Sequence, residues 1–243
     1  MKIVTEVMQV QLSNQPKAAL YGYQMQRLPH GYTNQTVRDG VVVVKTYAGP
    51  DALARLDREY RALQLVRDHV PVPPVLDRAP HTLTLGFVAG RHGQDLITAG
   101  HAEPVLAACG SVLHDIHRAG VGHGDFGPQN LPLDAGTFTA LAVLDWEFAA
   151  IPLIDNVADL AWCEWIVRMH HPEHVDALDS LFHRYGTRPR WHRRHAAMLE
   201  RCRELLDLAH PWEPDGAAER SWRHRIEITA SWRESAATPV DGY

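Results

Sequence analysis

A short stretch near the middle of the chain brings together residue types that can do chemistry. His123, Asp125 and Asn130 fit the pattern H-x-D-x-x-x-x-N, and Asp145 follows at the end of an apolar run. Glycine and proline residues in this stretch exclude a helix. Residues 134–136, Asp-Ala-Gly, suit a turn. We therefore predict a loop and a β-hairpin that bring Asp145 beside Asp125 and Asn130.

This grouping suits phosphoryl transfer from a nucleotide. One carboxylate must orient and deprotonate the attacking hydroxyl, and oxygen ligands must hold the Mg²⁺ that bridges the phosphates. Asp125 fits the first role, and Asn130 and Asp145 fit the second. The alternative is a polar turn in which Asp125 and Asn130 only cap neighbouring backbone groups.

The same stretch resembles the aminoglycoside phosphotransferase family of antibiotic kinases. The resemblance rests on His-Gly-Asp at 123–125, on Asn130 and on Leu-Asp-Trp-Glu-Phe at 144–148, in which Trp-Glu stands where protein kinases have Phe-Gly. It implies a protein-kinase-like fold, with ATP or GTP and Mg²⁺ as cofactors. It also implies that His123 supports the loop through hydrogen bonds and is not the base.

Lys45 lies inside a strand, Val41–Tyr47, that is otherwise suited to burial. Burying a lysine is unfavourable unless an anion compensates its charge. Alternation places Val43, Lys45 and Tyr47 on one face of the sheet. The resemblance implies that this face looks onto the nucleotide, with Lys45 on its α- and β-phosphates. The alternative is an edge-strand lysine whose amine reaches water.

An amphipathic helix follows Lys45, with Asp51 as its cap. Its apolar residues recur at three- and four-residue steps. The resemblance implies that a glutamate on this helix pairs with the strand lysine, and the register favours Glu59 over Asp57. The alternative is a solvent-facing Glu59 that pairs with Arg55 or Arg58 on the same helix.

The remaining nucleotide contacts are implied by the resemblance alone. A turn-rich link at 29–36 would cover the phosphates, with Gly31 and Thr33 as contacts. A strand over 82–88 would form the hinge between two lobes, after a rigid proline-rich connector at 70–76. The residues expected around the adenine are Leu85, Gly86, Phe87 and Val88.

The second half of the chain is predicted to be mainly helical. One helix spans Pro104–Arg118, and its His114 and His117 are interpreted as ordinary helix residues because no third metal ligand has suitable spacing. Another starts within 151–162, with Asp155 or Asn156 as its N-cap. The resemblance assigns Asp159 on this helix a structural role, holding the catalytic loop.

The acceptor site is expected in residues 164–243, where breaks are predicted near Pro172, 186–189 and 210–216. The acidic candidates to face a cationic acceptor are Glu164, Glu200, Glu204 and Asp207, although each could equally belong to a solvated helix face. Three tryptophans either pack the core or line the acceptor pocket: Trp162, Trp165 and Trp222. The stretch 184–203 is rich in arginine, which weakens a simple picture of an acidic acceptor cleft.

These features predict an α+β, two-lobed kinase-like protein. The N-lobe would span residues 1–88, with strands at 3–10 and 22–28, and the C-lobe residues 89–243. The formal net charge of −5 argues against a nucleic-acid partner, and no apolar run is long enough to span a membrane. Three widely spaced cysteines, an odd number, indicate a reducing cytoplasm. A monomer or a dimer is expected.

The leading functional hypothesis is a small-molecule kinase that phosphorylates a hydroxyl of an antibiotic, an aminoglycoside or a similar compound. A first alternative is a metabolite kinase acting on choline, homoserine or a sugar. A second is a catalytically silent nucleotide-binding module, against which the filled chemical positions argue. A protein kinase is disfavoured because Ala-Pro-Glu is missing between Asp145 and the next predicted helix.

Overall fold

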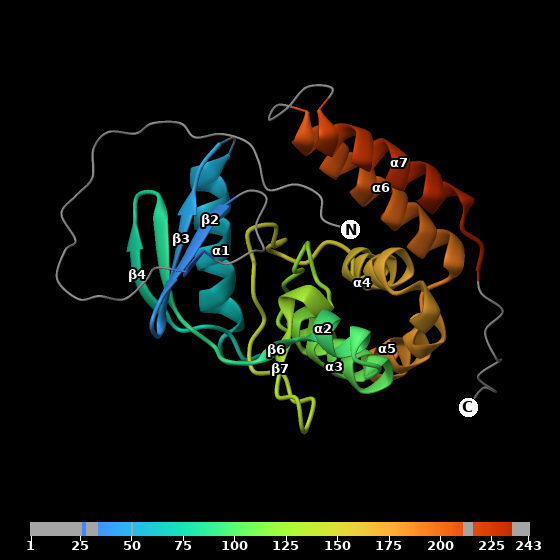
Figure 1. The fold of residues 1–243 in the computed structure, drawn as a ribbon, viewed down its shortest axis with the longest axis horizontal. Coiled ribbons are helices and arrows are strands. Elements are labelled where there is room, and N and C mark those ends of the chain that lie inside the picture. The colour runs from blue at the N-terminus through green and yellow to red at the C-terminus, as the bar shows by residue number, and fades with distance from the viewer. Residues whose placement is uncertain (1–25, 28–33, 50, 211–215, 235–243) are drawn as a thin grey trace.

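The computed structural model describes residues 26–27, 34–49, 51–210 and 216–234. They form a small lobe built on a β-sheet and a larger, mainly helical lobe (Figure 1), so the predicted two-lobed α+β architecture is confirmed. The strand predicted over 3–10 lies outside the described residues, as does most of that over 22–28. The small lobe contains β1 (Gln26–Arg27), β2 (Asn34–Asp39), β3 (Val42–Tyr47), α1 (Ala52–Val66), β4 (Val75–Ala79) and β5 (Thr82–Gly86).

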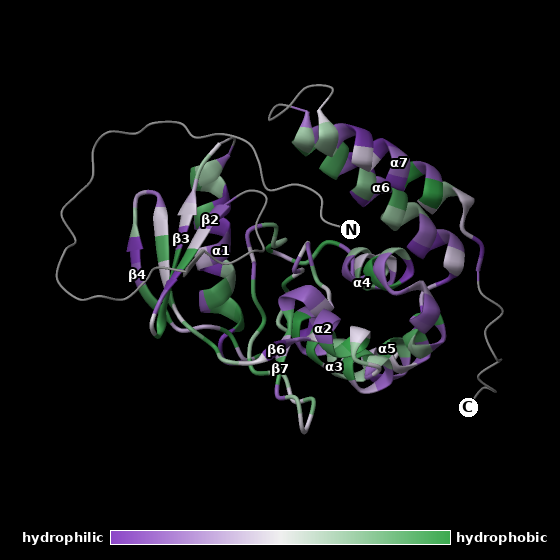
Figure 2. Cartoon of the chain, viewed as in Figure 1, coloured by the Kyte–Doolittle hydropathy of each residue, from purple (hydrophilic) through white to green (hydrophobic). Residues whose placement is uncertain are grey.

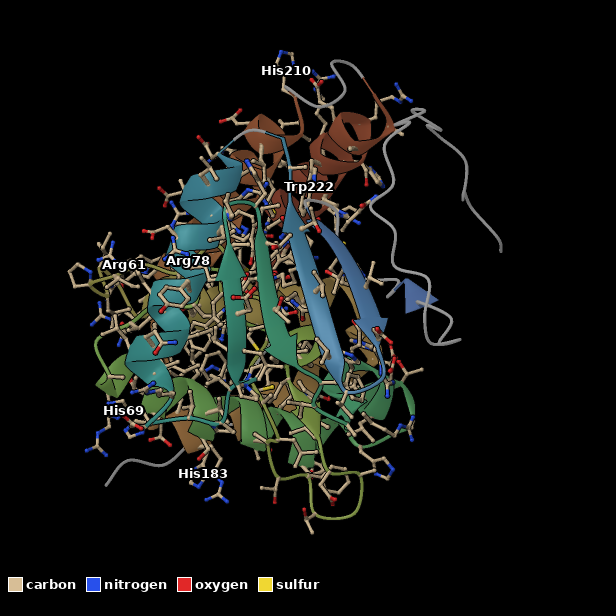
Figure 3. The ribbon with its side chains drawn as sticks, turned by 90° about the vertical axis from the view of Figure 1, so that its left-hand side faces the viewer. Arg61, His69, Arg78, His183, His210 and Trp222 are labelled. Atoms are coloured by element: carbon tan, nitrogen blue, oxygen red, sulfur yellow. The ribbon has the colours of Figure 1, made fainter. Side chains whose placement is uncertain are left out.

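The strands of the small lobe form one antiparallel sheet in the order β1-β2-β3-β5-β4. Figure 3 looks onto this sheet, with α1 along one side. Lys45 is paired with Leu83 and Val43 with Leu85, so these four side chains share one face. Helix α1 covers that face with apolar residues such as Leu56. The helix fixes the orientation of the lysine-bearing strand.

The small lobe differs from the prediction in three local features. Residues 34–36, expected in a turn-rich link, belong to β2, because they pair with β3, and the chain turns instead at Gly40, which has a φ of 58°. Strand β4 was not anticipated, since as an edge strand it exposes Asp77 and Arg78 and carries no apolar alternation. Asp51 occupies the cap position of α1, but its side chain makes no capping hydrogen bond.

The large lobe begins with a two-stranded ribbon and is otherwise helical. Helix α2 was not predicted, whereas α3 and α4 lie where the sequence places helices. The breaks near Pro172 and 186–189 are present. Its elements are β6 (Arg91–His92), α2 (Gly93–Thr98), α3 (Ala102–Arg118), η1 (Pro128–Asn130), β7 (Pro132–Leu133), α4 (Val157–His170), η2 (Pro172–Ala177), α5 (Leu178–Tyr185), α6 (Trp191–Ala209) and α7 (Ala217–Ser231).

Two loops carry the chemically interesting residues: the catalytic loop, residues 122–130, and the acidic loop, residues 144–150. The predicted fold-back between them is present, since Leu133 bridges Ala140 and the Asp134 N–H donates to the Thr139 carbonyl at 3.0 Å. The apolar run that follows is not a strand. Its last residue, Leu144, donates its N–H to the carbonyl of Asn130 at 2.9 Å, which places the acidic loop against the catalytic loop.

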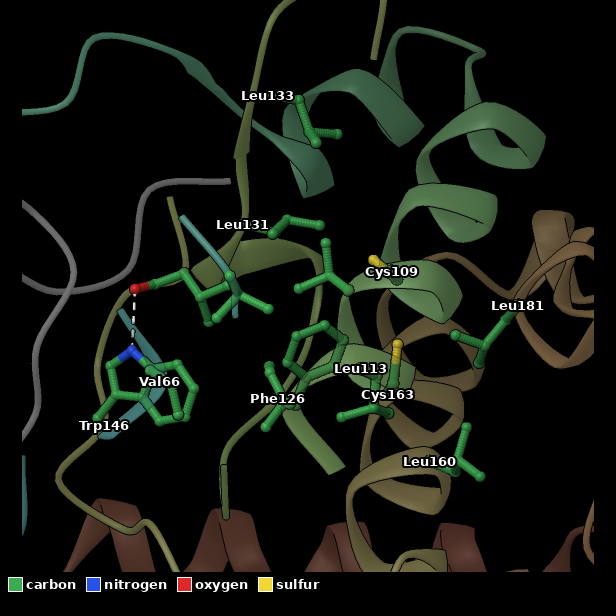
Figure 4. Packing of buried hydrophobic residues seen from close by; sticks show 14 of the residues in the cluster. Val66, Cys109, Leu113, Phe126, Leu131, Leu133, Trp146, Leu160, Cys163 and Leu181 are labelled. Atoms are coloured by element: carbon green, nitrogen blue, oxygen red, sulfur yellow. Dashed lines mark hydrogen bonds between the residues drawn. The ribbon is translucent and has the colours of Figure 1, made fainter. Parts of the chain in front are cut away.

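The helices of the large lobe pack around an apolar core. Figure 4 shows part of it, where Phe126 lies near Leu113 and Cys163 of the helices. The Trp146 indole N–H donates to the Val143 carbonyl at 3.0 Å. A second cluster joins α4 to the antiparallel pair α6 and α7, whose hydrophilic and hydrophobic residues alternate in Figure 2. Among the described residues, no helix has the length and apolar character needed to cross a bilayer.

Candidate active site

The catalytic loop is held in place by Asp159 of α4. Its carboxylate accepts the backbone N–H groups of His123 and Gly124, both at 2.7 Å, and lies 3.0 Å from the His117 imidazole. Although burial opposes ionisation, these donors keep the pKa of Asp159 below its usual range. The predicted structural role of Asp159 is confirmed. His117 is a buried partner of this carboxylate, a contact that the sequence analysis did not predict.

His123 joins the two loops. Its Nε2 donates to the Leu144 carbonyl at 2.9 Å, and its Nδ1 accepts the N–H of Asp125 at 3.2 Å, so these partners assign a neutral tautomer. Burial lowers the pKa of His123, which favours the same form. Gly124 has a φ of 81°, and a Cβ there would lie 2.1 Å from the Phe148 carbonyl oxygen. Only glycine lets the loops approach this closely.

Asp125 projects from the catalytic loop beside an indole and an amide. Its Oδ1 accepts the N–H of Trp162 at 2.7 Å, and its Oδ2 lies 3.2 Å from the amide nitrogen of Asn130. Burial raises the pKa of Asp125 to about 7, and repulsion from Asp145 adds to the rise, whereas the positive charge of Arg201 opposes it. A carboxyl that titrates near neutrality suits a group that takes a proton during a reaction.

Asn130 and Asp145 present oxygen ligands on the two loops. Asn130 uses its NH₂ to donate to the Asp125 backbone carbonyl at 2.9 Å, which turns its amide oxygen away from that contact. Asp145 has a φ of 68°, in the left-handed region that a non-glycine residue seldom adopts outside functional or turn positions. One carboxylate and one amide oxygen fit Mg²⁺, which usually takes one or two protein ligands together with phosphates and water.

Lys45 is buried between two carboxylates. Its Nζ lies 2.9 and 2.6 Å from the two oxygens of Glu59 on α1 and 2.7 Å from Oδ1 of Asp145. Burial disfavours its charge, but these carboxylates raise the pKa of Lys45 well above its usual range, so it is an ammonium. The Tyr47 hydroxyl also donates to Glu59, at 2.5 Å. The pairing of Lys45 with Glu59 is therefore present, and the edge-strand alternative is wrong.

A second buried ion pair, which the sequence analysis missed, ties α1 to the acidic loop. Arg55 donates to Oε2 of Glu147 at 2.5 Å, and both side chains are buried. Asn34 of β2 donates to the same oxygen at 2.8 Å, and Arg58 donates to the Glu147 carbonyl at 2.9 Å. The alternative pairing of Glu59 with Arg55 or Arg58 is therefore wrong. The helical register could have indicated that Arg55 is buried, because Arg55 lies one helical turn before Glu59 and shares its inward face.

The residues expected at the adenine follow β5 into the large lobe. Leu85 is buried on the sheet face that carries Lys45. The N–H groups of Gly86 and Phe87 donate to the carbonyls of Pro74 and Val41, at 2.8 and 2.7 Å. These two donors are committed to the protein, so an adenine could use only the carbonyls here, or the N–H of Val88. Gly31 and Thr33 lie outside the described residues.

Of the four acidic residues considered for a cationic acceptor, one is buried and three are exposed. Glu164 is fully buried and neutralised by Arg194 and by Arg168, whose Nε lies 2.8 Å away. The other three, Glu200, Glu204 and Asp207, are exposed on α6.

The three tryptophans pack together. Trp162 and Trp165 stack with ring centroids 4.4 Å apart, and Trp222 lies 5.8 Å from Trp165. One end of this cluster reaches the candidate site, because Trp162 contacts Asp125. Arg201 of α6, which the sequence analysis did not single out, lies at the same end, 5.8 Å from the Trp162 ring.

Comparisons with known proteins give a family match for part of the chain. The chain matches the model of the phosphotransferase enzyme family over residues 24–122, a stretch that ends one residue before His123. No curated protein sequence matches significantly.

Solved structures of kinases share the fold. The GDP and kanamycin complex of an aminoglycoside phosphotransferase is 12% identical, with a TM-score of 0.67, and the match covers 88% of this chain and 95% of that one. A choline/ethanolamine kinase family protein from Mesorhizobium loti is 14% identical, with a TM-score of 0.62 over 88% and 90%. The macrolide 2′-phosphotransferase MphH from Brachybacterium faecium is 16% identical, with a TM-score of 0.56 over 87% and 93%. The chain is thus similar to the phosphotransferase enzyme family over residues 24–122, and it shares the kinase-like fold of these solved structures.

Proposed function

We propose that the protein transfers the γ-phosphate of ATP, or of GTP, to a hydroxyl group of a small molecule. The observation that carries this proposal is that four side chains from distant parts of the sequence lie close together. Asn130 lies 3.2 Å from the carboxylate of Asp125, and the Lys45 amine lies 2.7 Å from that of Asp145, 100 residues away along the chain. These are the groups that phosphoryl transfer requires.

Asp125 is the catalytic residue of this proposal. It accepts a hydrogen bond from the acceptor hydroxyl and orients it toward the γ-phosphorus. The acceptor oxygen forms the new P–O bond, the bond between the γ-phosphorus and the β–γ bridging oxygen breaks, and the hydroxyl proton passes to Asp125 late in the step. The raised pKa of Asp125 suits it to take that proton near neutral pH.

Asn130, Asp145 and Lys45 prepare the nucleotide. The oxygens of Asn130 and Asp145 would hold Mg²⁺, which when bound neutralises charge on the phosphates. Lys45, aligned by Glu59, would bind the α- and β-phosphates. Gly31 and Thr33 remain predicted phosphate contacts, and Leu85 to Val88 remain the predicted adenine site. Catalysis would come mainly from positioning and charge neutralisation.

An antibiotic alcohol is the first acceptor class to test, because kanamycin and macrolides appear in the descriptions of structural neighbours. A metabolite alcohol is the second. The specific observations in its favour concern charge: Arg201 lies close to Asp125, and Glu164 of α4 is buried and neutralised by Arg194. A polycationic acceptor would gain little from these groups.

The test is phosphate transfer by the purified protein. ADP or GDP release would be measured with Mg²⁺ and a panel of antibiotics, choline, homoserine and sugars, and products would be identified by mass spectrometry. We expect transfer to at least one acceptor, lost in Asp125→Ala and retained in Asp68→Ala, which removes an exposed carboxylate. A parallel resistance screen in a sensitive bacterium covers the antibiotics. Nucleotide binding without transfer to any acceptor would instead indicate a silent module.

A further inference from the structure

The guanidinium of Arg201 has one edge without partners. Its Nη1 donates to Oε2 of Glu204 at 3.0 Å, on the exposed side of α6. Its Nε and Nη2 are shielded from water, and neither has a hydrogen-bond acceptor among the residues that the structure describes. Buried donors of this kind are rare, and each needs an explanation.

The unpartnered atoms form a specific recognition element. Nε and Nη2 belong to the same edge of the planar guanidinium, and their two parallel N–H groups match the two oxygens of a carboxylate or a phosphate. Arg194, on the same helix, uses its edges fully: Nε donates to the Pro189 carbonyl, and the other nitrogens contact Glu164 and Glu234. The empty edge is therefore a property of Arg201 and not of arginines buried on α6.

Arg201 lies next to the predicted catalytic carboxylate. Its Cζ is 4.8 Å from the centroid of the Phe148 ring, in the acidic loop, and 5.8 Å from that of the Trp162 ring. The Trp162 N–H donates to Asp125 at 2.7 Å. Cation–π contact with these rings positions the guanidinium but does not use the N–H groups of its Nε–Nη2 edge.

We propose that the acceptor carries an oxyanion close to its reactive hydroxyl, and that this group binds the Nε–Nη2 edge of Arg201 while the hydroxyl contacts Asp125. The inference rests on the proposed kinase function and adds a substrate class to it: alcohols that bear a carboxylate or a phosphate group. No new covalent step is needed. Glu164 cannot compete for Arg201, because Arg194 and Arg168 already neutralise it.

The first test uses three alcohols of similar size that differ in charge: glycerol, D-glycerate and glycerol 3-phosphate. Wild-type protein with Mg²⁺ and ATP or GTP is expected to phosphorylate an anionic alcohol with a higher kcat/KM than glycerol. The carboxylate and phosphate arms identify the source of the oxyanion. Because Trp162 contacts Asp125, intrinsic fluorescence gives a second readout, a saturable change on adding either anion.

Variants then assign the effect to one side chain. In Arg201→Gln, kcat/KM for the anionic alcohol is expected to fall about 10- to 100-fold, the usual weight of a hydrogen-bonded charge pair. Arg201→Lys should recover only part of the lost kcat/KM, since a lysine lacks the two parallel N–H donors of the guanidinium. The control is Arg203→Gln, an exposed arginine two residues along α6. Nucleotide affinity and the thermal midpoint should stay unchanged in all three.

The outcomes separate this inference from the proposed function. Transfer to kanamycin, choline or glycerol, with neither turnover nor a fluorescence change for both anionic alcohols, would overturn the inference and leave the kinase proposal standing. An equal kcat/KM for anionic alcohols in wild type and Arg201→Gln would also overturn it. A saturable fluorescence change that Arg201→Gln abolishes would support it even if neither probe is turned over.

Discussion

We call the surroundings of Lys45 and Asp145 the nucleotide side of the candidate site, and the surroundings of Asp125 and Arg201, with helices α4 and α6, the acceptor side. Each side has a buried arginine–glutamate pair, but the two pairs have different roles. On the nucleotide side, Arg55 and Glu147 join α1 of the small lobe to the acidic loop of the large lobe. On the acceptor side, Arg194 and Glu164 join α6 to α4 within the large lobe. The first pair crosses the boundary between the two lobes, whereas the second neutralises an acidic group on α4, the helix that also carries Trp162.

The charged residues are arranged differently on the two sides. The nucleotide side concentrates opposite charges, because Lys45 lies between Glu59 and Asp145 and a triphosphate would replace part of that arrangement. The acceptor side neutralises its buried acid and leaves one cationic edge, on Arg201, without a partner. Variants that break one side at a time can therefore show whether the two sides act independently.

The largest expected effect comes from breaking the two buried pairs. Glu147→Gln and Glu164→Gln should each lower the free energy of unfolding by about 3–5 kcal/mol, because each removes the charged carboxylate from a buried ion pair. Their functional effects should differ: Glu147→Gln should weaken nucleotide binding, and Glu164→Gln should change the acceptor KM. Denaturant unfolding and steady-state kinetics check both. Equal effects of the two variants on nucleotide and acceptor would show that the sides are coupled.

Next in size is the loss of the lysine between the carboxylates. Lys45→Met should lower kcat/KM about 10²- to 10³-fold, as removal of one electrostatic contact to a reacting group does. The loss should be equal for every acceptor, unlike that of Arg201→Gln, since Lys45 would contact only the nucleotide. The double variant Lys45→Met/Glu59→Gln, which removes both buried charges, should be more stable than Lys45→Met but no more active. A loss of kcat/KM that differs between acceptors would contradict the separation of the nucleotide side from the acceptor side.

The sequence indicated that Lys45, Asp125 and Asn130 are unusual positions because each stands out within a short pattern. Asp125 and Asn130 are five residues apart on one loop, and Lys45 is conspicuous as a charge within a valine-rich strand. The Lys45–Glu59 contact follows from helix register once α1 packs on β3. Arg55 was visible in the same register, but no local feature indicates that its partner lies 92 residues away.

The acceptor side could not be predicted in the same way. Its properties depend on how α4 and α6 pack, which decides that Glu164 meets Arg194 and that Arg201 reaches Trp162. The local sequence around a helical glutamate does not distinguish an exposed side chain from one that is paired with a distant arginine. For a related reason the sequence could not show that the N–H groups of Gly86 and Phe87 donate to carbonyls of other segments.

A smaller effect is expected from pH. Burial raises the pKa of Asp125 to about 7, so below that pH the carboxylate becomes protonated and cannot accept the acceptor proton. The rate constant kcat/KM should therefore fall about tenfold per pH unit on the acidic side and level off above neutrality. Arg201→Gln removes a positive charge beside Asp125 and should move the midpoint upward. A midpoint that stays in place in this variant would show that Arg201 does not sense the carboxylate.

The smallest effect should come from the hydroxyl that supports Glu59. In Tyr47→Phe the 2.5 Å hydrogen bond to Glu59 is lost while the ring stays in the core, so the free energy of unfolding should fall by about 1.5 kcal/mol. The Lys45 contacts remain, and nucleotide affinity should change less than in Lys45→Met. Tyr60→Phe is the matched control, since Tyr60 lies on α1 with its ring under Arg78 at 4.6 Å. If Tyr47→Phe instead weakened nucleotide binding as strongly as Lys45→Met, the tyrosine and not the lysine alone would fix the orientation of Glu59, and the nucleotide side would be a three-residue unit.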